Sequence, residues 1–187
     1  MKRKFFILAT AFCLAITAAC NMYEIDKANK LVDEANKSIN EANDGINSST
    51  AKLVEMEKAV QQIHNDEQLE AQRAVAKGII TSLEKTRDQY KNAGDKFESA
   101  SKLKLPEKFK EYLEYKAKEM KKRGEVADAM IGEPQALISS DGKSDYEEKV
   151  ETVVAKFKSL KQEAADLEAK ADKIFEENKA LFKSQSS

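Results

Sequence analysis

The sequence has few of the residues from which most enzyme and metal sites are built. Among 187 residues there is no tryptophan and one histidine, His64, with two cysteines, two prolines and six glycines. One histidine excludes histidine-rich zinc, haem and di-iron sites and supports no Ser-His-Asp set, and the chain has no glycine-rich phosphate loop. We therefore expect no enzyme, no cofactor and no metal, with His64 facing solvent. A metal site made of glutamates alone stays open as an alternative.

The charge balance argues against nucleic acid as a partner. Charged residues make up 35% of the chain, with a formal net charge of −1, and residues 20–187 carry 29 Lys and Arg against 33 Asp and Glu. Nucleic-acid binding calls for a clear basic excess instead. The same composition, rich in Ala, Glu and Lys and poor in Gly and Pro, predicts long helices.

Residues 1–20 have the pattern of a secretory leader. Three basic residues stand at 2–4, residues 5–16 carry no charge, and Thr17-Ala18-Ala19 precede Cys20. Ala19 followed by Cys20 resembles the lipobox of bacterial lipoproteins, in which the cysteine thiol is diacylated and the chain is cut just before it. We therefore predict a signal peptide over 1–19 and lipidation at Cys20, which would attach the protein to a membrane.

Three other interpretations of residues 1–20 are a transmembrane anchor, a secreted protein without lipid and a disulfide at Cys20. A transmembrane anchor needs about 20 apolar residues, and this run offers roughly 15. A secreted protein that is free in solution would have no need for a cysteine at the cleavage site. A disulfide at Cys20 is excluded, because the one other cysteine, Cys13, lies inside the segment to be removed and the mature chain would hold no second cysteine.

The rest of the chain shows helical periodicity in four stretches. Apolar residues recur at steps of three and four, and we predict helices over about 21–64, 66–103, 106–132 and 144–183. The first carries a heptad seam at Ile25, Ala28, Val32, Ala35, Ile39, Ala42 and Ile46.

The seam of the first helix keeps its phase through Asp44-Gly45, a pair that normally marks a turn, and so favours one continuous helix. With short connections, the four stretches predict an all-α fold, an elongated antiparallel four-helix bundle or coiled coil in one domain over 20–187. Residues 133–143 are expected to form the one long connection. A rival arrangement, in which the first helix associates with copies of itself in an oligomer, uses the same seam.

One stretch of charge stands out. Residues 102–123 contain nine basic and four acidic side chains. This basic stretch has two interpretations. It is either a helix face exposed to solvent or a surface that contacts anionic groups such as lipid head groups. The residues predicted to make this contact flank the turn between the second and third helices, and they are Lys102, Lys104, Lys108 and Lys110.

A lipobox cysteine followed almost at once by a heptad helix resembles the murein lipoprotein of bacterial outer membranes over about the first third of the chain. That family joins a C-terminal lysine to the cell wall, whereas this chain ends Ser184-Gln185-Ser186-Ser187, so this attachment is not supported. Asn21, rather than aspartate, follows the cysteine. The resemblance therefore implies a lipid-anchored envelope protein, in the outer membrane if the cell is Gram-negative.

Two functions are compatible with this pattern. The leading hypothesis is a non-enzymatic envelope lipoprotein that acts as a scaffold or protein-interaction module, with the membrane, a protein or further copies of itself as partners. The alternative is a sensory or ligand-binding domain that holds a small molecule between helices. Such a domain needs converging polar groups, for which the seams offer Gln72, Thr86 and Asn178.

Overall fold

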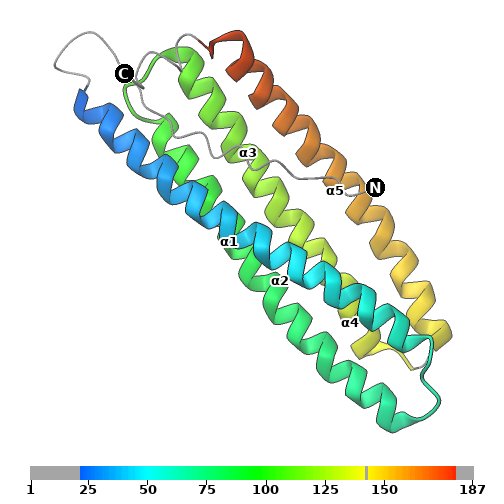
Figure 1. The fold of residues 1–187 in the computed structure, drawn as a ribbon. Coiled ribbons are helices and arrows are strands. Elements are labelled where there is room, and N and C mark those ends of the chain that lie inside the picture. The colour runs from blue at the N-terminus through cyan, green and yellow to red at the C-terminus, as the bar shows by residue number, and fades with distance from the viewer. Residues whose placement is uncertain (1–21, 142, 180–187) are drawn as a thin grey trace.

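The computed structural model describes residues 22–141 and 143–179, which form an elongated array of α-helices without a strand among them (Figure 1). The helices are α1 (Met22–Val60), α2 (Asp66–Ser101), α3 (Glu107–Met130), α4 (Gly132–Ser139) and α5 (Lys143–Glu177). The all-α prediction is confirmed for this part of the chain, and its four long helices are consistent with a helical bundle. The predicted signal peptide and Cys20 lie outside the described residues.

The four long helices pack in sequence, α1 on α2, α2 on α3 and α3 on α5. Contacts between neighbours join residue numbers that rise along one helix and fall along the next. These contacts are Glu34–Lys96, Glu41–Gln89 and Ser49–Ser82 between α1 and α2, Glu98–Lys121 and Arg87–Asp128 between α2 and α3, and Tyr112–Phe175 and Lys122–Glu163 between α3 and α5. Each long helix therefore starts at the end of the molecule where the previous long helix stops (Figure 1).

The two ends of the molecule have separate hydrophobic clusters. The basal end, as we call it, holds the first residues of α1 and the connection 102–106, and Ile25 and Leu105 belong to its cluster together with Phe97, Phe109 and Leu113. The opposite end, which we call the tip, holds the connection 61–65, α4 and the start of α5. Its cluster includes Met56, Val60, Ile79, Leu83, Leu137 and Tyr146.

Small residues between the two clusters bring α1 and α2 close together. The helix α1 runs unbroken through Gly45, where a Cβ atom would lie 2.2 Å from Thr86 Oγ1. Thr86 is buried and donates to the carbonyl oxygen of Ser82 (2.9 Å), while Ser49 Oγ donates to Ser82 Oγ (3.0 Å). Gly45 is therefore a point of helix contact rather than a helix break. The heptad seam of α1, which the oligomer alternative would use, packs against α2 here.

The segment 133–143 differs from the expected connection, because most of it forms the short helix α4. Pro134 stands in the first turn, where its missing N–H breaks no hydrogen bond, and Gly132 lies against Val153 of α5 with no room for a Cβ atom. Pro134, Ala136 and Leu137 are buried. Packed on α2 and α5, α4 extends the cover that the shorter α3 leaves incomplete. Eight residues are too few for helical periodicity to distinguish this helix from a loop.

Within residues 22–141 and 143–179, no helix combines the length and the apolar character that crossing a membrane requires.

Candidate functional site

The four predicted contact lysines all lie at the basal end, around the connection between α2 and α3. Lys102 Nζ donates to Glu98 (2.7 Å) and Lys108 Nζ to Glu111 (2.7 Å), so two of the four are ion-paired. Hydrogen bonds from Lys102 and Lys121 lower the pKa of Glu98 to about 2. The structure thus brings the four lysines together beside the start of α1, with Lys104 exposed and Lys110 partly buried.

The deepest charged group is Glu119, on the face of α3 toward α5. Its side chain is fully buried and accepts hydrogen bonds from Lys116 Nζ (2.5 Å) and Arg123 Nε (2.7 Å). Arg123 Nη2 also pairs with Glu168 of α5 at 3.0 Å. Every charge in this network is thus paired, and the ion pair between Arg123 and Glu168 links α3 to α5.

The described residues do not form a metal site. Within the described ranges, 22–141 and 143–179, no three side chains among His, Cys, Asp and Glu are grouped so as to hold a metal ion. His64 is exposed, and its backbone N–H donates to Gln68 Oε1 (2.7 Å) as part of the start of α2. Asn65 caps that helix by accepting from the Gln68 amide (2.9 Å).

A cavity of about 250 Å³ lies at the tip. Its walls, of mixed polar and apolar character, come from four segments: the end of α1, the first turn of α2, α4, and α5. The lining residues are Val60, Ile63, His64, Asn65, Asp66, Leu69, Leu137, Ser140, Asp141 and Tyr146. Val60, Leu137 and Tyr146 are buried, whereas Asp66 and Asp141 are exposed, so an apolar interior opens through an acidic mouth.

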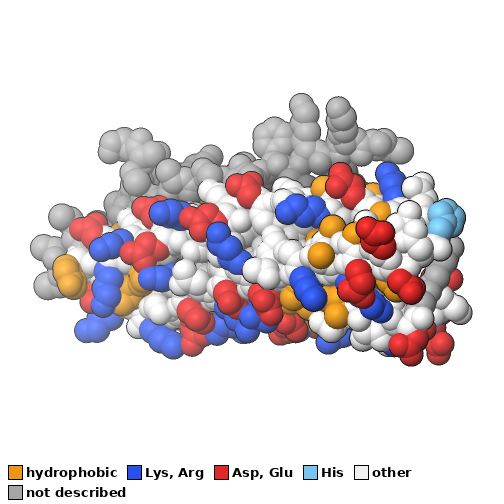
Figure 2. Space-filling view, turned by 90° about the horizontal axis from the view of Figure 1, so that it is seen from below, with side chains coloured by type: hydrophobic (Ala, Val, Ile, Leu, Met, Phe, Trp, Pro, Cys, Tyr) orange, Lys and Arg blue, Asp and Glu red, His pale blue; other side chains and the backbone are white. Residues whose placement is uncertain are grey.

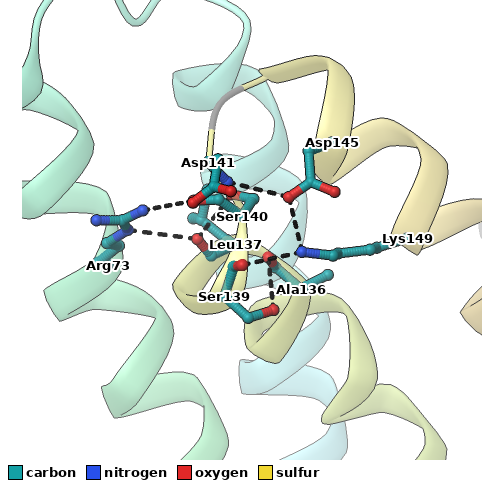
Figure 3. Close-up of polar contacts among 8 residues, drawn as sticks. All are labelled: Arg73, Ala136, Leu137, Ser139, Ser140, Asp141, Asp145 and Lys149. Atoms are coloured by element: carbon teal, nitrogen blue, oxygen red, sulfur yellow. Dashed lines mark hydrogen bonds and ion pairs between the residues drawn. The ribbon is translucent and has the colours of Figure 1, made fainter.

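Two cations fix the wall that α4 contributes to this cavity (Figure 3). Arg73 of α2 donates from Nη2 to the carbonyl oxygen of Ser140 (2.6 Å) and from Nε to that of Leu137 (3.4 Å). On the other side, Lys149 Nζ donates to the carbonyl oxygen of Ser139 (2.9 Å) and to Asp145 Oδ2 (2.7 Å). The last carbonyls of α4, which no helical amide reaches, are thereby satisfied by positive charge.

A second, more open cavity of about 380 Å³ lies beside the first. It is lined by Glu57, Lys58, Gln61, Tyr146, Glu147 and Val150. Tyr146 lines both cavities, and its hydroxyl donates to Glu133 Oε1 of α4 (3.4 Å).

Glu133 is the most perturbed carboxyl group at the tip. Burial, followed by the charge of Glu57 and a hydrogen bond with it, raises the pKa of Glu133 to about 7. Burial also raises the pKa of Tyr146, with the negative charges of Glu133 and Glu57 adding to the effect. A carboxyl group from α1, one from α4 and a hydroxyl from α5 therefore meet at one place, and of these the carboxyl group of Glu133 has its pKa raised to about 7.

Sequence reasoning did not single out this tip. The signal available to it was indirect: Tyr146 opens the seam of the fourth helix, while Glu133 stands next to Pro134 in a segment expected to be irregular. The three polar seam residues that it did single out line neither cavity. Thr86 donates to Ser82 and Asn178 to Ile174, each within its own helix, and Gln72 is partly buried.

Comparison with protein-family models, with curated proteins and with solved structures finds no match for this chain.

Proposed function

We propose that this protein is a non-enzymatic, lipid-anchored lipoprotein of the bacterial envelope, whose rod of antiparallel helices acts as a scaffold or protein-interaction module. One observation carries the proposal. The helix α1 starts at Met22, two residues after Cys20, and the lysine-flanked connection 102–106 lies at that same end. An acyl chain on Cys20 and the basal lysines would thus meet one membrane surface together.

The length of the rod supports a role at a distance from that surface. The 39 residues of α1, at a rise of 1.5 Å each, extend about 58 Å. A membrane-bound basal end would therefore hold the tip, with its cavities, about 60 Å away. Asn21 after the cysteine favours the outer membrane as the site of anchoring if the cell is Gram-negative.

The alternative of a sensory or small-ligand domain receives less support. A ligand held between the helices would need polar groups that converge on a cavity in the bundle. Thr86 and Asn178 instead satisfy carbonyls of their own helices, and both cavities lie at the tip.

The test of the proposal is mass spectrometry of the full chain produced in a bacterial host. We expect the mature protein to start at Cys20 with its thiol diacylated, and Cys20→Ser to remain uncleaved and unmodified. Cys13→Ser is the matched control, since it replaces the other cysteine and should leave processing unchanged. A mature wild-type N-terminus without lipid would contradict the proposal.

A further inference from the structure

We propose that the 250 Å³ tip cavity is the docking site for a basic segment of another protein, which inserts one large apolar side chain between α1, α2, α4 and α5. This inference rests on the proposed function, because it names the working surface of the interaction module and the chemistry of its partner.

The size and walls of the cavity select one side chain. Pockets for drug-sized molecules and cofactors span about 300–1,000 Å³, and this cavity lies below that range. Its interior is formed by Val60, Leu137 and Tyr146, all buried, with the partly buried Ile63 and Leu69 nearer the opening. In protein interfaces a few side chains carry most of the binding energy, and among them are aromatic residues that fill a well-packed pocket.

The charge around the cavity selects a basic partner. Residues 55–73 and 133–151, which build the tip, carry eleven acidic and four basic side chains. Figure 2 shows acidic side chains near the single histidine, which marks this end of the molecule. At the mouth itself, Asp66 and Asp141 are exposed, and neither makes an ion pair with another described residue.

Two cations near this mouth whose side chains the structure describes, Arg73 and Lys149, are engaged in hydrogen bonds. Arg73 is held by Glu70 and by two carbonyl oxygens of the α4 end, and Lys149 by Asp145 and the Ser139 carbonyl (Figure 3). These bonds keep the α4 wall in place before a partner arrives. A preorganised wall lowers the entropy cost of binding.

A peptide titration tests the inference on the lipidated full chain in detergent micelles. The probe is a twelve-residue synthetic peptide with one tryptophan between two pairs of lysines. Because the chain itself has no tryptophan, indole fluorescence reports on the peptide alone. We expect a blue shift on binding, an affinity that falls as salt rises, and loss of binding when the lysines are replaced by glutamate. A peptide with alanine in place of the tryptophan gives no indole signal and is therefore tested as a competitor, which should not displace the tryptophan peptide.

Two double variants locate the binding. The variant with both Asp66→Asn and Asp141→Asn should bind the peptide about fivefold more weakly or worse, since it removes both negative charges at the mouth of the cavity. Asp26→Asn with Asp33→Asn, two exposed residues of α1 at the basal end, changes net charge equally and should leave the affinity unchanged. Circular dichroism of both variants verifies the fold. No blue shift with the wild-type chain, or equal affinities for the two double variants, would overturn the proposal.

The two proposals fail separately. If the mature protein carries no lipid but binds the peptide at the tip, the lipid anchor is rejected and the docking site is kept. If the protein is lipidated but does not bind the peptide, the docking site is rejected and the lipid anchor is kept.

Discussion

Replacing Glu133 by glutamine should change how the stability of this protein depends on pH. The pKa of the Glu133 carboxyl group is raised to about 7 in the folded protein, first by burial and then by Glu57. The folded state therefore holds this proton more tightly than the unfolded chain does. The resulting stabilisation is complete below the ordinary glutamate value of 4.5 and is lost as pH rises through about 7. Wild-type stability should thus fall across this window.

The size of the effect follows from the same two values. A pKa raised from 4.5 to about 7 corresponds to about 3 kcal/mol between the two protonation states. Glu133 keeps some contact with solvent, which screens its interaction with Glu57, so we expect about 1–2 kcal/mol in practice. Glutamine keeps the shape of the protonated acid and carries no charge. At pH 8 the Glu133→Gln variant should therefore be more stable than the wild type by about this amount, with the two nearly equal at pH 4.5.

Most other shifted carboxyl groups act outside this window. Their lysine or arginine partners lower the pKa values of Glu34, Asp88, Glu98 and Asp145, so the stability they contribute is lost only as pH falls below their ordinary values. Burial raises the pKa of Asp172 above its ordinary value of 3.8. Like Glu133, Asp172 therefore makes the folded protein less stable as pH rises. A variant at Asp172 separates the two contributions.

Urea unfolding between pH 4.5 and 8 measures the prediction. Wild type, Glu133→Gln and Asp172→Asn are compared with Glu148→Gln, an exposed residue of α5 that should follow the wild type. If Glu133→Gln loses stability with rising pH as steeply as the wild type does, the carboxyl group is not the source of the dependence and the reasoning is refuted.

Three further variants test the packing of the helices and the basal surface. Gly45→Ala should lower the free energy of unfolding by about 1–3 kcal/mol, because the new Cβ atom would lie 2.2 Å from Thr86 Oγ1. Gly78→Ala is the control: its Cβ atom would meet nothing within 4 Å, and thermal unfolding should show α2 stabilised by up to about 1 kcal/mol. Equal effects of the two substitutions would contradict the close approach of α1 and α2. Changing the four basal lysines to glutamine should abolish low-salt binding of the unlipidated chain to anionic vesicles in a sedimentation assay, and undiminished binding would leave these lysines as a solvated face.

Helical periodicity was enough to predict an all-α chain, because long amphipathic helices repeat one signal over many turns. It could not predict α4, since eight residues provide barely two turns and contain both Gly132 and Pro134. It also could not interpret Glu119. A glutamate in a chain with 33 acidic residues is expected on the surface, and its burial depends on Lys116 and Arg123 one turn away on either side.

The tip shows why a candidate site can be invisible in a sequence of this kind. Its cavity depends on tertiary contacts between segments far apart in the chain: the α1–α2 connection, the end of α4 and the start of α5. None of these segments carries a binding motif, and the decisive contacts run from side chains to backbone, as Arg73 to Ser140 and Lys149 to Ser139 do. A backbone carbonyl has no residue type that marks it as an acceptor. A cavity of this kind therefore becomes visible only once the helices are placed.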